Sequence, residues 1–117
     1  MDKNIDTVVT QLFEDEVILA DTNEESAVVD LQETLENDYS IQYICSGGAG
    51  TADIEVLESI NGTDWETNGT KVGTGLTASD TGLVKYASGG GAAFIKVLVT
   101  ETGKSDPITV NIWICTR

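Results

Sequence analysis

The residues of this chain that could do acid–base chemistry are carboxylates, because the sequence contains no histidine. That absence removes the Ser-His-Asp and Cys-His catalytic arrangements and histidine-ligated metals. Asp53 and Glu55 lie close together, with Glu58, Asp64 and Glu66 shortly after them. A glycosidase needs two carboxylates on either side of a cleft, but here they alternate with apolar residues, as on any solvated strand face. We therefore predict no catalytic residue and no enzymatic activity.

The two cysteines, Cys45 and Cys115, are too few to build a structural zinc site. Each falls in a strand-like segment. In a reducing compartment we expect buried thiols, with a disulfide between the two as the alternative. Loops that carry Asp64 or Asp80 offer oxygen ligands for calcium, yet no loop matches the calcium-loop pattern. We predict no metal and no cofactor.

Trp65 and Trp113 are the side chains best suited to bind a ligand by stacking. Trp113 is expected on the outward face of the last strand, beside Asn111, and Trp65 directly follows a turn. Exposed aromatic rings on a β-sandwich can form a platform for sugars. The alternative is that each ring packs at a sheet edge, under a loop or in a subunit interface. A glycan ligand stays open on these residues alone.

The stretch ESINGTDWETNGT, residues 58–70, contains Asn-Gly-Thr twice, at Asn61 and Asn68. This is the acceptor pattern for N-glycosylation. The N-terminus lacks a basic start followed by an apolar run, so we expect no signal peptide and no route to that modification. Asn-Gly between alternating segments is also a strong hairpin signal. We therefore predict a tight turn at each site.

The elements that must position these residues are short strands, because apolar residues recur with a period of two. Such segments lie at 7–13, 16–20, 26–31, 39–46, 51–58, 92–101 and 107–115. The segment 32–38 could form a helical turn, and no stretch sustains a helical period. The sequence predicts an all-β fold with about eight short strands and little or no helix. We expect a single antiparallel β-sandwich, of jelly-roll or immunoglobulin-like order, with a small barrel as the alternative.

Charge sets limits on partners, because the chain has a formal net charge of −14 and a pI near 4.1. Its one arginine is Arg117, and it has no basic cluster. Binding to nucleic acid needs lysine and arginine to neutralise phosphates, and an anionic membrane surface would repel this chain. No window has the length of apolar sequence that a membrane span needs. We predict neither nucleic acid nor membrane as a partner.

The acidic excess is concentrated in residues 1–38, which carry twelve acids and one base. This is the pattern of a solvated face, or of a segment that docks on a basic partner. We divide the chain into an acidic, strand-forming N-terminal arm at 1–24 and a β-sandwich domain at 25–117. The arm is rich in β-branched residues and could add a strand to a neighbour's sheet.

Two segments, at 26–65 and 94–114, resemble a loosely defined group of small phage and prophage β-sandwich proteins. The resemblance covers about two-thirds of the chain and leaves out residues 1–24. In that group a turn of the Asn-Gly-Thr-Asp-Trp type closes an end of the sandwich with its tryptophan. The matching residues are Asp30-Leu31, Ser40-Ile41-Gln42, Asn61 to Trp65, and Phe94 to Thr100.

The resemblance implies a non-enzymatic virion structural protein, either a capsid decoration (cement) protein or a neck or tail accessory protein. It implies a homo-oligomer, with a trimer favoured, that contacts other virion proteins such as the major capsid protein. Its expected location is the virion, after synthesis in the host cytoplasm. The alternative is a carbohydrate-binding β-sandwich module, with exposed coplanar rings among Tyr39, Tyr43, Tyr86 and the tryptophans. The candidate interaction residues are Val8, Val9, Leu12, Phe13, Trp65 and Trp113.

Overall fold

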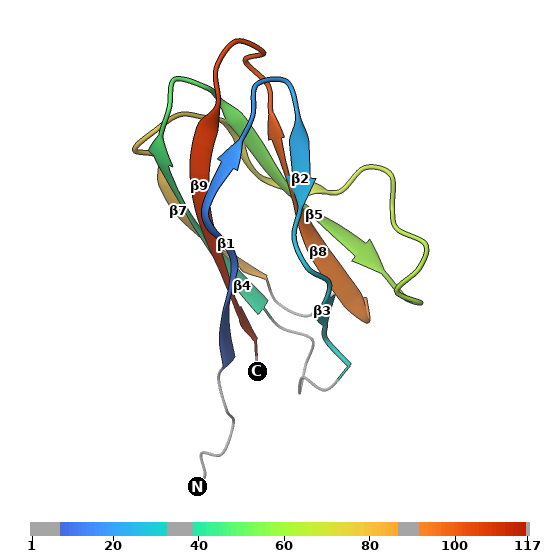
Figure 1. Ribbon diagram of the computed structural model, residues 1–117. Coiled ribbons are helices and arrows are strands. Elements are labelled where there is room, and N and C mark those ends of the chain that lie inside the picture. The colour runs from blue at the N-terminus through green and yellow to red at the C-terminus, as the bar shows by residue number, and fades with distance from the viewer. Residues whose placement is uncertain (1–7, 33–38, 87–91, 117) are drawn as a thin grey trace, which may run out of the picture.

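The computed structural model describes residues 8–32, 39–86 and 92–116. In this part of the chain, strands form two antiparallel sheets packed face to face, without a helix (Figure 1). The predicted all-β sandwich is therefore confirmed, while the predicted helical turn falls almost wholly at residues that the structure does not describe. The strands are β1 (Val8–Ile18), β2 (Asn23–Glu25), β3 (Val29–Asp30), β4 (Tyr39–Gly47), β5 (Ala52–Ser59), β6 (Thr70–Leu76), β7 (Thr81–Tyr86), β8 (Phe94–Glu101) and β9 (Ile108–Thr116).

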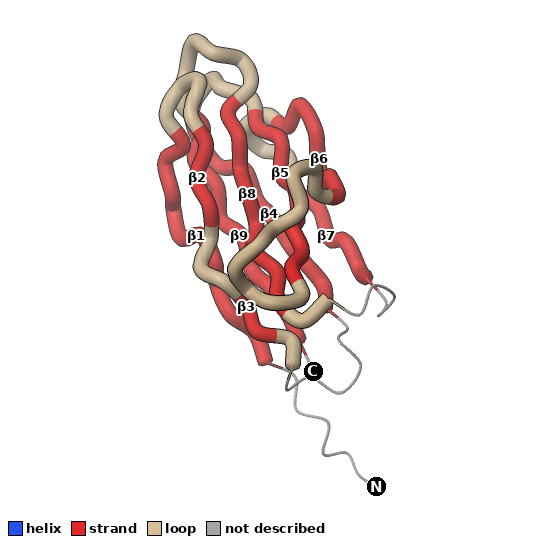
Figure 2. Tube along the Cα trace, turned by 90° about the vertical axis from the view of Figure 1, so that its right-hand side faces the viewer, coloured by secondary structure: helices blue, strands red, loops and turns tan. Residues whose placement is uncertain are grey.

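The strand order resolves the choice between jelly-roll and immunoglobulin-like connections. One sheet has the order β1-β9-β4-β7, and the other has β2-β8-β5-β6, with β3 also paired to β8. The first strand thus pairs with the last, the next two with β8, β4 with β7, and β5 with β6. This nesting of antiparallel pairs is the jelly-roll arrangement. Figure 2 looks onto the sheet that contains β2, β8, β5 and β6, with the other sheet behind it.

The core lies between the sheets and follows the alternation read from the sequence. In β8, residues at every second position are buried and those between them are half-buried. β5 alternates in the same way from Ala52 to Val56, and Leu57 and Ser59 are then buried as well. β4 and β9 show the same alternation. The side chains that fill the space are mainly aliphatic, with Phe13, Tyr39 and Tyr43 as the larger members. Fully buried aliphatic residues include Ile41, Ile54, Val97, Val99, Val110 and Ile112.

The described part of the expected arm belongs to the sandwich. β1 pairs antiparallel with β9 along its length, from Val8 opposite Thr116 to Ile18 opposite Ile108. The two strands expected in this region are one strand, interrupted by register shifts between Gln11 and Glu16. Phe13 and Ile18 are buried in the core, at 4% and 0% exposure. Residues 8–18 are therefore a structural strand of the domain, which the division at residue 24 did not anticipate.

The two Asn-Gly sites do not form two separate hairpin turns, because both lie in the single loop that joins β5 to β6. The side-chain oxygen of Asn61 accepts the N–H groups of Thr63 and Asp64, both at 2.9 Å. The Ser59 hydroxyl accepts the N–H of Gly62 at 2.9 Å and donates to the Asp64 carbonyl at 2.6 Å. Gly62 has φ of +78° and packs on the ring of Phe94. Side-chain hydrogen bonds thus shape a turn inside a longer loop.

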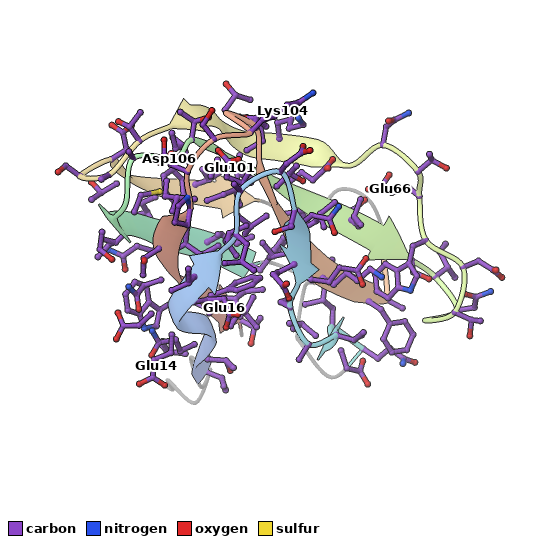
Figure 3. The ribbon with its side chains drawn as sticks, turned by 45° about the horizontal axis from the view of Figure 1, so that its top comes forward. Glu14, Glu16, Glu66, Glu101, Lys104 and Asp106 are labelled. Atoms are coloured by element: carbon purple, nitrogen blue, oxygen red, sulfur yellow. The ribbon has the colours of Figure 1, made fainter. Side chains whose placement is uncertain are left out.

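A buried carboxylate holds the opposite end of the sandwich together. Glu101, at the end of β8, is 1% exposed and continues the inward-facing positions of that strand. Its oxygens accept backbone N–H groups of Asp21, Thr51, Gly103 and Lys104 at 2.7–3.0 Å. Figure 3 shows Glu101 close to the loop that carries Lys104. Because three separate loops donate to one side chain, Glu101 fixes their mutual positions.

Candidate interaction surface

The exposed apolar side chains of the described residues gather along β1. Four of the seven large ones lie on this strand or directly after it, and β1 is an edge strand of its sheet. Val8 is 53% exposed and Val9 65%, Val17 is 49% and Leu19 is 62%. An unpaired edge with apolar side chains is a template for pairing with another chain.

The edge of β1 is not uniform. From Val8 to Gln11 the register with β9 is regular. Beyond Gln11 it shifts twice, and Asp15 has a positive φ of 46°. The Asn111 side-chain oxygen accepts the Asp15 N–H at 2.8 Å, and the Phe13 carbonyl accepts the Gln11 amide at 3.1 Å.

The irregular half of β1 also carries charge. Glu14 and Glu16 are exposed there, as Figure 3 shows. Bulges and charges are the devices that protect a sheet edge from unwanted pairing. The second half of β1 is therefore protected, whereas the segment 8–11 is left open.

The predicted interaction residues of the arm separate into two pairs. Val8 and Val9 project from the open segment and are exposed. Leu12 is half-buried against the core, and Phe13 is part of the core. The register shift between Gln11 and Phe13 turns the Phe13 side chain inward opposite Ile112. Phe13 is therefore a packing residue, and this part of the surface consists of Val8 and Val9.

Trp65 is held by its own domain. The loop that carries it crosses the outer face of β5 and β8, where Glu66 and Gly69 bond to Glu58 and Glu55. The Lys96 ammonium lies 4.6 Å from the centroid of the Trp65 ring. Trp65 is half-buried in this position. Of the three packing positions considered for Trp65 (a sheet edge, under a loop, or a subunit interface), packing beneath its own loop describes it best.

Trp113 lies on the outer face of the other sheet, as predicted. It stands in register between Gln11 on β1 and Gln42 on β4, and Gln42 faces Leu83 on β7. A depression of about 300 Å³ opens beside the ring, lined by Val9, Ser40, Gln42, Leu83, Trp113, Ile114 and Cys115. None of these lining residues carries a formal charge. The ring is half-buried, so part of it borders the depression.

The two tyrosine side chains that the structure describes do not extend an aromatic platform. Tyr39 and Tyr43 are 6% and 7% exposed and belong to the core. Burial raises the pKa of Tyr43, with smaller contributions from Cys45 and Asp80. The side chain of Tyr86 falls outside the described part of the chain. Trp113 is therefore the ring that borders the depression.

The carboxylates of β5 are engaged in structural contacts. Lys71 bonds Asp53 at 2.8 Å, and the Gly75 N–H bonds it at 2.9 Å. Partial burial would raise the pKa of Asp53, but these bonds outweigh it and hold the pKa below its usual value. Burial, aided by Glu66, raises the pKa of Glu58. The described residues include no group of three or more acidic, cysteine or histidine side chains arranged to hold a metal ion.

Both cysteines are free thiols. Cys45 lies opposite Val110, and Cys115 lies opposite Ser40, so the two occupy different rows of the sheet. The alternative of a disulfide between them is therefore wrong. Burial and the nearby charge of Asp80 raise the pKa of Cys45 to about 11. Cys115 is half-buried on the outer face beside Trp113.

Comparison with known proteins gives a fold but no family. No protein-family model matches the chain, and no curated protein matches it. Among solved structures it is similar to the SPBc2 prophage-derived protein YomS, with a TM-score of 0.50 and 13% identity over 94% of this chain and 93% of that one. This similarity supports the resemblance to phage-type β-sandwich proteins at the level of the fold.

Two other solved structures are similar at lower scores. The Yersinia pseudotuberculosis-derived mitogen has a TM-score of 0.49 and 7% identity over 95% of this chain and 85% of that one. A protein of infectious bursal disease virus, Gx strain, has a TM-score of 0.48 and 9% identity, with 94% of this chain covering 32% of that one. Scores at this level describe a shared sandwich shape and carry no argument about function. The described residues also contain no helix with the length and hydropathy of a membrane crossing.

Sequence reasoning missed two features of this surface. Gln11 and Gln42 flank Trp113, but only the pairing of β9 with β1 and β4 brings them together. The sequence pattern that could have indicated them is the alternation of their strands, in which each glutamine faces outward and an adjacent apolar residue faces the core. Val8 and Val9 were predicted as interaction residues, but the end of the open edge after Gln11 could not be found in this way, because the register shifts there leave no local sequence pattern.

Proposed function

We propose that this chain is a non-enzymatic structural protein of a phage particle, a capsid decoration protein or a neck or tail accessory protein. The observation that carries the proposal is the open edge at the start of β1. Val8 and Val9 are exposed there, in the half of the strand that pairs regularly with β9, and the protected half follows after Gln11. Such an edge is suited to strand addition, in which backbone hydrogen bonds supply affinity and side chains supply selectivity. The fold shared with a prophage-derived protein supports the same class.

The jelly-roll order adds support of a general kind, because this architecture recurs in capsid domains as well as in lectins. A fold alone does not fix a function. The edge therefore carries more weight than the fold, since it names residues through which a contact would form. The partner can be another copy of this chain or another virion protein such as the major capsid protein.

Charge determines which partners suit this edge. Each copy carries a net charge of −14, so two copies repel each other as they associate. Salt weakens this repulsion, because at 0.1 M ionic strength it screens charges that lie more than about 10 Å apart. We expect a homo-oligomer, with a trimer favoured, that becomes more stable as salt is added. A partner with a basic surface would instead bind more weakly as salt is added.

The test is the mass of the protein in solution, measured by light scattering at low and high salt. The variant Val8→Lys/Val9→Lys places charge on the open segment. Val17→Lys/Leu19→Lys is the matched control on the protected half. Substitution is preferable to truncation, because removing β1 would also remove Phe13 and Ile18 from the core.

We expect an oligomer for the native chain and for the control, and a monomer for the edge variant. Slow amide exchange at residues 8–11 in the native oligomer, and fast exchange in the edge variant, would locate the contact on β1. An oligomer that both variants leave intact would show that β1 is not the interface. A native chain that is monomeric at every salt concentration would overturn self-association through this edge.

A further inference from the structure

The depression beside Trp113 is lined by an aromatic ring and uncharged polar groups, and the proposed function assigns no role to it. It lies on the outer face of the sheet β1-β9-β4-β7, away from the space between the sheets. Its floor includes the half-buried indole, and its apolar borders are Val9 and Leu83, 65% and 59% exposed. In a chain with 20 acidic residues, a depression whose described lining residues include no carboxylate is set apart from the rest of the surface.

The polar side chains around Trp113 differ in whether they already make hydrogen bonds within the protein. The Gln11 amide nitrogen already donates to the Phe13 carbonyl and to the Asn111 side-chain oxygen. Gln42, on the other side of the ring, is exposed, and among the described residues its side chain has no hydrogen-bond partner. The Ser40 hydroxyl, also on the depression, is likewise unengaged within that part of the chain. One amide and one hydroxyl are thus left for a ligand.

These features fit a small neutral ligand that has an apolar face and several hydroxyl groups. The indole offers an apolar surface for C–H groups. Gln42 offers both a donor and an acceptor, and Ser40 a hydroxyl that can act as either. The volume of about 300 Å³ is at the lower end of small-molecule sites.

We propose that this depression binds an uncharged sugar residue, stacked on Trp113 and hydrogen-bonded to Gln42 and Ser40. Val9 and Leu83 enclose the ring from the two outer strands. A sugar acid would be disfavoured, because the net charge of −14 repels anions and the described residues that line the depression include no basic side chain. The inference rests on a face of the sheet and shares only Val9 with the open edge, since Trp113, Gln42 and Ser40 lie outside residues 8–11.

Fluorescence can test the site, because the chain has two tryptophans. In Trp65→Phe, Trp113 is the remaining fluorophore. This variant is titrated with glucose, galactose, mannose and N-acetylglucosamine, with their linear trisaccharides, and with glucuronic acid as the charged control. Each ligand that changes the emission is measured again by calorimetry on the native chain.

We expect at least one neutral sugar to change the Trp113 emission in a saturable way with a millimolar Kd, and glucuronic acid to leave it unchanged. Trp113→Ala should weaken binding more than about tenfold, and Gln42→Ala about three- to tenfold. Circular dichroism would show whether Trp113→Ala keeps its fold, and Gln42→Ala gives an independent test on an exposed side chain. The proposal is overturned if no neutral sugar binds, or if binding survives both substitutions.

Discussion

Asp21 donates its backbone N–H to the buried carboxylate of Glu101 across 2.8 Å, and so attaches the turn between β1 and β2 to the end of β8. Asp21 has a positive φ of 59°, and so does Lys104, at 72°. Both N–H groups point at the same carboxylate. A strained backbone conformation at two non-glycine residues is tolerated here because a charged acceptor compensates for it.

The Glu101 contacts predict how stability depends on pH. The backbone hydrogen bonds of Asp21 and Thr51, aided by those of Lys104 and Gly103, lower the pKa of Glu101 from 4.5 to about 2. Because the folded-state pKa is the lower one, the ionised carboxylate stabilises the fold above pH 4.5. That contribution is lost as the pH falls from 4.5 towards 2.

Replacing the carboxylate should remove this dependence. We expect Glu101→Gln to be less stable than the native chain at pH 7 and to lose less stability between pH 4.5 and 2. Urea unfolding at pH 7, 4.5, 3 and 2 measures both effects. Glu24→Gln, on an exposed side chain of β2, is the control and should follow the native curve. Parallel curves for Glu101→Gln and the native chain would contradict the assignment.

The placement of β1 predicts that two of its residues, Phe13 and Val9, respond very differently when their side chains are replaced by alanine. Phe13 is 4% exposed in the core, so Phe13→Ala should cost about 3–5 kcal/mol of unfolding free energy. Val9 is 65% exposed, so Val9→Ala should change it by less than about 0.5 kcal/mol. Chemical denaturation of dilute protein gives both numbers. A small effect at Phe13 would mean that β1 packs loosely and behaves as an arm.

The two thiols should react at different rates. Burial and the charge of Asp80 raise the pKa of Cys45 to about 11, so at pH 8 only about one thiol in a thousand is ionised. Cys45 is also inaccessible, at 0% exposure, whereas Cys115 is half-buried on the outer face. We expect iodoacetamide to label Cys115 first in the native protein, and both residues after unfolding. Mass mapping of the labelled peptides tests this, and equal labelling in the native state would contradict it.

Much of the fold follows from local sequence, because alternation is a local property. Most inward positions of β4, β5, β8 and β9 are apolar positions of their segments, and the outward position of Trp113 follows from the same period. Glu101 could have been found by extending the alternation of β8, which places a carboxylate at an inward position. Its partners could not, since they come from loops distant in sequence.

The features that sequence did not predict depend on contacts between distant residues. Asn61 and Asn68 resemble hairpin turns, but their loop is long because it crosses the outer face of the sheet, where Trp65 meets Lys96. Phe13 faces inward because β1 shifts register against β9. The strand order itself depends on which edges meet, and the period of a strand does not encode this.

The pairing of β1 with β9 also sets the order in which the chain can fold during synthesis. The β5–β6 hairpin needs only nearby residues, whereas Val8 must wait for Thr116, which is synthesised much later. Closing so long a loop makes this the slowest pairing of the nested series. Until then the apolar side chains of β1 remain uncovered in the nascent protein. The acidic residues of the same strand, such as Glu14 and Glu16, add like-charge repulsion that opposes association with other chains through that interval.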